Sequence, residues 1–247
     1  MAATPAALTA AEVRAVRRDT PGCGAGPLRR LRRLGRPAPV HFNAAGSSLP
    51  PRPVLEAQLR YLRDEARRGG YEQVEAEAAA LRDVYAGVAE LLNCAPAEVA
   101  VLESATAAWQ QAFFGVRFAA GDEVWTSENE YGSNYINLLQ ARRRDGIAIR
   151  VVPNGPAGSL DVGRLEEMLA AAERPPKLLC VSMIPTSSGT VQPAAAVGAV
   201  AERHGVPYLL DACQAAGQLP LDVAELRCTW LVSPFPFPSQ GVGRVAV

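Results

Sequence analysis

Polar residues follow several apolar stretches of this sequence, and their types could bind a small ligand. Ser104-Ala105-Thr106 opens a helical pattern, so free backbone N–H groups and the Thr106 hydroxyl could hold a phosphate. Tyr131 follows the apolar stretch 122–126 and could stack on a flat ring. Each signal is weak alone, because a hydroxyl before a helix is usually an N-cap and a lone tyrosine usually lies in a core or on a surface.

Two further polar groups follow later apolar stretches. Thr186 belongs to a hydroxyl-rich segment at 185–190, which by itself indicates only a polar turn. Asp211 follows the apolar stretch 206–210, and Gln214 comes three residues later. Asp211 could cap a helix, but a carboxylate at the mouth of a buried strand also suits the protonated ring nitrogen of a cofactor such as pyridoxal phosphate.

Short apolar segments alternate with amphipathic ones after residue 98, which predicts an α/β fold with a mostly parallel seven-stranded sheet and helices on both faces. Strands are expected at about 99–103, 122–126, 147–152, 178–184, 206–210, 229–233 and 242–247. Helices are expected near 106–117, 131–144, 161–172 and 193–204. Ligands of such sheets bind beyond the carboxyl ends of the strands, so the polar groups should gather at one edge.

The sequence before this alternation predicts helices and an arm. Amphipathic spacing favours one helix from Pro53 to a stop at Gly69-Gly70 and a second over Tyr71 to Leu92. Residues 1–40 form an expected Arg-rich N-terminal arm with a short helix at 9–18, and residues 41–247 a single large domain. An organelle transit peptide is the alternative for the arm, although serine is absent from it.

Composition excludes several classes of function. Twenty-five basic residues balance 25 acidic ones at a sequence pI near 6.7, so a nucleic-acid or membrane-surface partner is not expected. The five cysteines include no Cys-x-x-Cys pair and are accompanied by two histidines, which argues against a metal site. No apolar run reaches the length of a membrane span, and we expect a cytoplasmic protein with reduced thiols.

Taken together, these motifs resemble those of the class V aminotransferase family, pyridoxal 5′-phosphate enzymes of fold type I that include cysteine desulfurases and isopenicillin N epimerase-like proteins. The matching segments are His41 to Gly46, Ser104 to Thr106, Ser127 to Asn134, Ile184 to Thr190 and Tyr208 to Val223. The resemblance covers about residues 41–232. A G-x-G-x-x-G motif is absent, so a nicotinamide-binding domain is disfavoured.

The resemblance implies a role for each candidate residue. The cofactor phosphate would be bound by Ala105 and Thr106, and Tyr131 would lie over the pyridine ring, where the family often has histidine. Asp211 would pair with the ring nitrogen, and Gln214 would hydrogen-bond the phenolic oxygen. Thr186 lies in the turn that touches the cofactor, where the family usually has asparagine.

The Schiff-base lysine of the family is missing from this sequence. The segment Ser233 to Gly241, where the family places it, contains no lysine, and Lys177 is the only lysine in the chain. Lys177 precedes the strand expected at 178–184, roughly 20 Å from its carboxyl end at about 3.3 Å per residue. We therefore assign no catalytic residue and expect impaired catalysis. The smaller C-terminal domain of the family is also expected to be absent.

Two functions stay open at this point. The first is a pyridoxal phosphate enzyme that acts on an amino acid as a transaminase, lyase or epimerase. A desulfurase is less favoured, because none of the cysteines occupies the place of the family's nucleophilic cysteine. The second is a non-catalytic remnant that binds the cofactor or a full-length homologue. The family further implies a homodimer with its sites at the subunit interface.

Overall fold

The computed structural model describes residues 8–23, 41–234 and 244–246. These residues fall into two compact units, the first up to Ala80 and the second from Leu81 onward. The expected division into an arm at 1–40 and a domain at 41–247 stays a prediction. In the part of the chain that the structure describes, no helix is long and apolar enough to cross a membrane.

The first unit is helical, and local sequence signals at Thr9 and Gly69 mark the start of α1 and the end of α4. The helix expected at 9–18 is α1, and Thr9 caps it because the Thr9 hydroxyl accepts from the Glu12 N–H at 3.3 Å. Gly69 ends α4 with φ of 98°, a conformation that favours glycine. The bounds are α1 Ala10–Asp19, η1 Pro21–Cys23, α3 Ala44–Ser47, α4 Arg52–Arg68 and α5 Gly70–Ala76.

The prediction of a single helix over Tyr71 to Leu92 is wrong. The segment forms α5 and then α6 (Ala78–Leu92), which are separated at Glu77. The Glu77 N–H still bonds to the Gln73 carbonyl at 3.0 Å, so the interruption lasts one residue. The apolar spacing continues across so short a break, and periodicity alone therefore does not reveal it.

The second unit contains the seven-stranded sheet that the sequence predicts, in the order β1-β7-β6-β5-β4-β2-β3. The five strands from β6 to β3 are parallel, while β7 pairs antiparallel with both β6 and β1. The strand bounds are β1 Ala100–Leu102, β2 Glu123–Ser127, β3 Ala148–Val152, β4 Leu178–Ser182, β5 Tyr208–Asp211, β6 Trp230–Ser233 and β7 Arg244–Ala246.

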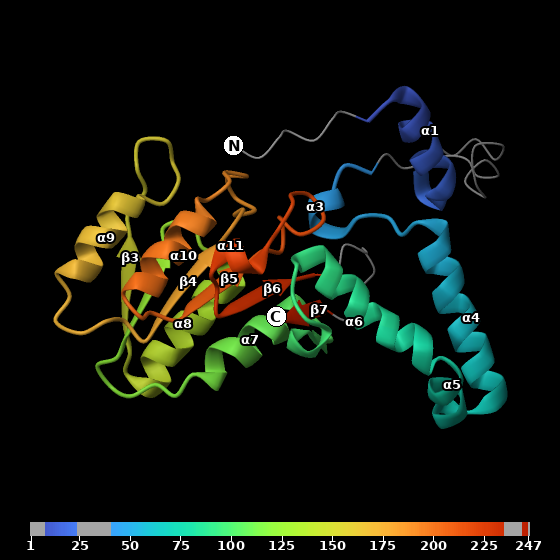
Figure 1. Cartoon of the computed structure of the whole chain (residues 1–247), viewed down its shortest axis with the longest axis horizontal. Helices are drawn as coiled ribbons and strands as arrows, with labels where there is room; N and C mark the ends of the chain where they lie inside the picture. Colours follow the sequence, from blue (N-terminus) through green and yellow to red (C-terminus); the bar gives the residue numbers. More distant parts are fainter. Residues whose placement is uncertain (1–7, 24–40, 235–243, 247) are drawn as a thin grey trace. The chain divides into compact units, whose positions relative to one another are not determined.

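Helices cover both faces of this sheet (Figure 1). Their bounds are α7 Ala105–Gly115, α8 Gly132–Asp145, α9 Val162–Ala170, α10 Ala194–Arg203 and α11 Val223–Leu226, with η2 at Pro96–Glu98. The four longer helices match the expected ones. The sequence analysis missed α11, because four residues are too few to show a helical period. Asp222 caps α11 by accepting from the Ala224 N–H at 2.8 Å.

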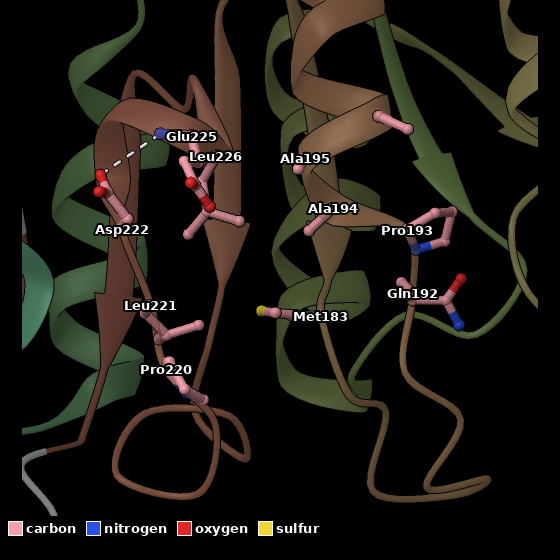
Figure 2. Close-up of a pocket in the computed structure, with 11 residues that line it drawn as sticks. Met183, Gln192, Pro193, Ala194, Ala195, Pro220, Leu221, Asp222, Glu225 and Leu226 are labelled. Carbon is pink, nitrogen blue, oxygen red and sulfur yellow. Dashed lines mark hydrogen bonds between the residues drawn. The ribbon is translucent and has the colours of Figure 1, made fainter. Parts of the chain in front are cut away.

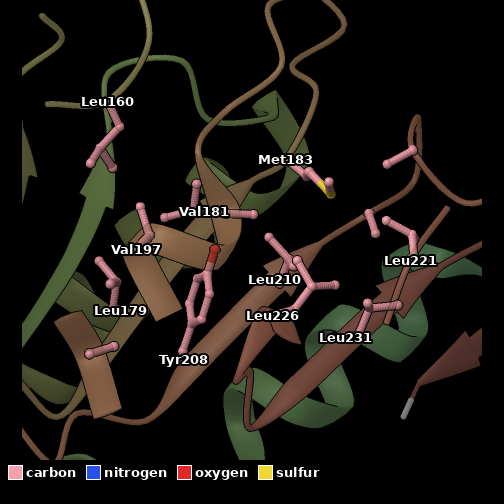
Figure 3. Close-up of a cluster of buried hydrophobic side chains, with 14 of the residues drawn as sticks. Leu160, Leu179, Val181, Met183, Val197, Tyr208, Leu210, Leu221, Leu226 and Leu231 are labelled. Carbon is pink, nitrogen blue, oxygen red and sulfur yellow. The ribbon is translucent and has the colours of Figure 1, made fainter. Parts of the chain in front are cut away.

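The hydrophobic core consists of two clusters, one on each face of the sheet. Alternate residues of β4 belong to different clusters: Leu179 and Val181 pack with α6, α9, α10 and α11, whereas Leu178 and Cys180 pack with α7 and α8. Figure 3 shows the first cluster, in which Tyr208 lies among apolar side chains. Burial on both faces fixes the register of the strands, and with it the residues at their carboxyl ends.

Candidate functional site

The carboxyl ends of β2, β4 and β5 bring polar residues to one edge of the sheet. Ser127 ends β2, Ser182 ends β4 and Asp211 ends β5. Ser182 and Asp211 are direct partners in the β4–β5 ladder. All three are at least nine-tenths buried. Ser182 and Asp211 have hydrogen-bond partners within the protein, whereas the Ser127 hydroxyl has none among the described residues.

Glu130, in the turn between β2 and α8, is the centre of a hydrogen-bond network at this edge. Its Oε1 accepts from the Tyr131 N–H at 2.8 Å, from Asn134 Nδ2 at 3.0 Å and from the Ser182 hydroxyl. Its Oε2 accepts from the Thr126 hydroxyl at 3.2 Å. One carboxylate therefore joins the ends of β2 and β4 to the first turn of α8.

Asn134 extends this network to Asp211. The amide nitrogen Nδ2 of Asn134 donates to Asp211 Oδ2 at 2.7 Å, and the Cys213 N–H donates to Asp211 Oδ1 at 3.0 Å. Asp211 is 6% exposed and Asn134 is 2% exposed. Two donors on different oxygens thus fix the plane of a buried carboxylate at the end of β5.

Burial also changes the acid–base properties of this edge. Loss of water raises the pKa of Glu130, and the hydrogen bonds from Ser182 and Asn134 oppose that rise. The nearby charge of Asp211 raises the Glu130 pKa further. Burial likewise raises the pKa of the Cys180 thiol on β4 well above its usual value.

Tyr131 lies beside this network with an accessible ring. It is the N-cap residue of α8, and its backbone N–H donates to Ser182 Oγ at 3.2 Å as well as to Glu130. The residue is 46% exposed. Its backbone is therefore fixed while its phenol ring is free to contact a ligand.

The residues at the start of α7 are placed as a phosphate-binding turn would require. Ser104 is the N-cap, as the simpler interpretation held, because its hydroxyl accepts from the Ala107 N–H at 3.0 Å. The first turn of a helix leaves its N–H groups without intrahelical acceptors, and Ala105 and Thr106 belong to that turn. Ala105 is buried and Thr106 is exposed.

Thr186 and Gln214 lie in the turns that follow β4 and β5. The turn with Thr186 is closed by the Ser188 and Gly189 N–H groups, which donate to the Pro185 carbonyl at 3.2 and 2.8 Å. Thr186 is exposed and Gln214 is half-buried. Among the described residues, Tyr131 is hydrogen-bonded directly to Glu130, and Asp211 is joined to Glu130 through Asn134. Within this same part of the chain, no hydrogen bond joins Thr106 or Thr186 to Glu130.

Sequence reasoning missed Glu130, Asn134, Ser182 and Thr126. The spacing of four between Glu130 and Asn134, at the start of a helix, was an available signal because such residues are neighbours on a helix surface. The position of Ser182 at the end of an apolar strand was another. Lys177 lies at the opposite, amino end of β4: its side chain is exposed, and its N–H donates to the Glu123 carbonyl at 2.8 Å.

A pocket of about 300 Å³ lies elsewhere, between the end of β4, the start of α10 and residues 220–226 (Figure 2). Met183, Pro193 and Leu221 are among its lining residues, and none of the residues of the Glu130 network are. Of its two acidic lining residues, Asp222 already accepts from Asn93 Nδ2 at 2.7 Å and from the Ala224 N–H at 2.8 Å, and Glu225 belongs to α11 itself. We therefore place the chemistry at the strand edge and not in this pocket.

Comparisons with known proteins agree with this architecture. The family model "Aminotransferase class-V" matches residues 40–234. A probable cysteine desulfurase of Methanothermobacter thermautotrophicus is 30% identical over 198 residues, which cover 79% of this chain and 48% of that protein. A cysteine desulfurase of Klebsiella pneumoniae is 30% identical over 204 residues, with 78% and 48% covered. The chain spans about half the length of these curated relatives.

Solved structures share the fold at lower identity. The apo structure of a cysteine desulfurase from Thermococcus onnurineus NA1 gives a TM-score of 0.78 at 20% identity, covering 95% of this chain and 56% of that one. A lysine-to-alanine mutant of C-DES, with glycine covalently linked to its PLP cofactor, gives 0.74 at 21% identity, covering 82% and 55%. The match over most of its length confirms the resemblance seen in the motifs, and this chain belongs to the class V aminotransferase family.

Proposed function

We propose that this chain binds pyridoxal 5′-phosphate at the edge formed by β2, β4 and β5, as the large domain of a protein that acts on an amino acid. The transaminase, lyase and epimerase types are the reaction classes that we consider. The observation that carries the proposal is the buried Asp211 carboxylate, fixed by Asn134 and the Cys213 N–H at the carboxyl end of β5.

The described residues fit the non-covalent contacts of this cofactor. Each Asp211 oxygen accepts one of these two hydrogen bonds, and a carboxylate oxygen has two lone pairs, so a ring N–H can still be bound. Tyr131 is 46% exposed and its backbone N–H donates to Ser182, the ladder partner of Asp211, so its ring could cover a ligand bound there. The first turn of α7 offers N–H groups and the Thr106 hydroxyl for a phosphate.

The roles of the side chains follow from these positions. Asp211 would hold a proton at the ring nitrogen, where a positive charge stabilises negative charge at the reacting carbon. Tyr131 would cover one ring face and exclude water, and Gln214 would donate to the phenolic oxygen. Ala105 and Thr106 would orient the phosphate end, and Thr186 would lie in the turn that touches the cofactor. When bound, pyridoxal phosphate supplies an electron sink for bonds at the α-carbon of an amino acid.

We also propose that catalysis is impaired. Lys177, the only lysine of the sequence, is exposed at the amino end of β4, away from Asp211 at the carboxyl end of β5. No lysine of this sequence is therefore placed beside Asp211 to move the substrate α-proton, which is general-base work. The alternative is a non-catalytic protein that binds the cofactor or a homologue. A C-DES mutant in which one lysine is replaced by alanine holds PLP with glycine covalently linked, which is in keeping with cofactor binding by such a variant.

The names of the relatives make cysteine the first substrate to test. A desulfurase needs a nucleophilic thiolate, and burial raises the pKa of Cys94, Cys180 and Cys228, the last to about 11. These three of the five thiols are therefore poor nucleophiles at neutral pH, and none of the five occupies the place of the family's nucleophilic cysteine. We therefore still place desulfuration behind the other reaction types for this chain. We further propose a homodimer, which sedimentation analysis of the full chain would test.

The cofactor proposal is tested with the full chain and pyridoxal phosphate. After borohydride reduction, mass spectrometry should find no specific pyridoxyl adduct at Lys177, and amino acids should not be turned over. A stable Lys177 adduct with turnover would refute impaired catalysis. Asp211→Ala should weaken cofactor retention by more than about 1 kcal/mol, the size of one hydrogen bond. Glu128→Ala, which removes an exposed carboxylate from the same edge, is the control and should retain the cofactor.

A further inference from the structure

The Oε1 atom of Glu130 is hydrogen-bonded to Tyr131 directly and to Asp211 through Asn134, and these are the two residues proposed to contact the ring. Glu130 Oε1 accepts from the Tyr131 N–H at 2.8 Å, which fixes the backbone of the residue that would cover the ring. The same oxygen accepts from Asn134 Nδ2 at 3.0 Å, and Asn134 donates to Asp211 at 2.7 Å. Glu130 is thus linked to both ring contacts by hydrogen bonds.

The Asn134 amide can form this link in only one orientation, with its NH₂ group toward the two carboxylates. Its NH₂ group has two hydrogens and lies between two carboxylates, Glu130 and Asp211, which accept hydrogen bonds. If the amide were flipped, its oxygen would face both carboxylates, and no hydrogen bond could form because all of these oxygens are acceptors. Loss of Glu130 would leave one hydrogen without its acceptor, and Asn134 is 2% exposed, so water has little access to replace it.

Glu130 is itself held by the sheet. The Thr126 hydroxyl of β2 donates to its Oε2 at 3.2 Å, and the Ser182 hydroxyl of β4 donates to its Oε1. Thr126 and Ser182 are both buried in the sheet, which makes them rigid supports. The position of the Glu130 carboxylate therefore follows from β2 and β4, and it transmits that position to α8 and β5.

We propose that Glu130 is a positioning residue for the cofactor ring, which orients Asp211 through Asn134 and fixes Tyr131 through its backbone N–H. The inference rests on the proposed binding of pyridoxal phosphate. Glu130 acts through its neighbours and not by touching the ring. Its removal should therefore weaken the contact to the ring nitrogen more than it weakens binding of the rest of the cofactor.

Two ligands separate this role from general support of the fold. Pyridoxal 5′-phosphate carries the ring nitrogen, and 1-deazapyridoxal 5′-phosphate has a C–H in its place. Equilibrium dialysis of the full chain should show that it prefers pyridoxal phosphate by about tenfold or more, the effect of one charge-assisted hydrogen bond. Glu130→Ala should bring the preference close to one. Glu130→Gln should restore most of it, because its amide oxygen can accept from Asn134, and Glu128→Ala should leave it unchanged.

Each outcome decides between the alternatives. If Glu130→Ala weakens both ligands by the same factor, or neither, the proposed role is wrong. If Glu130→Ala does not fold by circular dichroism, Asn134→Ser breaks the same link and should also abolish the preference; a retained preference would overturn the inference. A native chain that binds neither ligand refutes the proposed function itself, and one that binds both equally refutes the role of Asp211.

Discussion

Gly198 lies where α10 approaches the end of α11, and its replacement tests the packing that we describe. A Cβ built on Gly198 would lie 2.0 Å from the Leu226 carbonyl oxygen and 3.0 Å from the Leu226 carbonyl carbon. An ordinary carbon–oxygen contact is about 3.3 Å or longer. Gly198 is buried, and Gly198→Ala therefore requires the two segments to separate by more than about 1 Å within the core.

Helix propensity and overpacking act in opposite directions, and together they set the expected change in the free energy of unfolding. Alanine favours a helix over glycine by about 1 kcal/mol, whereas overpacking a rigid core costs typically about 1–3 kcal/mol and occasionally more. The obstacle is backbone, in a segment that Asp222 caps, so it does not move aside as a flexible side chain would. We expect Gly198→Ala to lower the free energy of unfolding by about 2 kcal/mol.

Urea unfolding followed by tryptophan fluorescence measures this change. Gly87→Ala is the matched control: Gly87 lies inside α6, and its added Cβ would meet nothing within 4 Å. That variant should gain up to about 1 kcal/mol from helix propensity alone. Equal stability of Gly198→Ala and the native chain, or a gain like that of Gly87→Ala, would refute the close approach of α10 and α11.

Three further expectations concern polar groups. The Tyr208 hydroxyl is buried and has no hydrogen-bond partner among the described residues, so Tyr208→Phe should leave the melting temperature unchanged or raise it; a large drop would reveal a partner. Because burial raises the Glu130 pKa from 4.5, the folded chain binds that proton more tightly, and its stability should fall as pH rises from below 4.5 through the raised pKa. Glu130→Gln should flatten this slope in urea unfolding at several pH values. Asp222→Ala removes the cap of α11 and should cost about 1–2 kcal/mol in the same assay, and no loss would contradict the cap.

The sequence predicted the sheet well because its strands are short apolar runs with clear ends. The strand expected at 178–184 is β4, Leu178–Ser182, and all of its residues are buried, as a parallel strand covered on both faces must be. The interruption of the helix at Glu77 was not predicted, because the apolar spacing continues across it. Local pattern thus located whole elements but not a one-residue interruption within them.

The site was predictable only in part, and the reason is again physical. Asp211 and Tyr131 could be identified because each follows an apolar strand and has a chemistry that suits an aromatic ring. Glu130 and Asn134 were missed: their spacing of four shows that they can contact each other, but their importance comes from hydrogen bonds to partners on other strands. Such pairs are brought together by the strand order, which a single sequence does not display.

The bond between Asn134 and Asp211 also has a consequence for biosynthesis, since it joins residues 77 positions apart. At about 5–20 residues per second, a ribosome needs roughly 4–15 s to add the residues between them. During that interval the nascent chain carries Glu130 and Asn134 without their partner on β5. The bonds of Glu130 to Tyr131, Asn134 and Ser182 can therefore form first, and the bond that fixes Asp211 can close only after β5 has been synthesised.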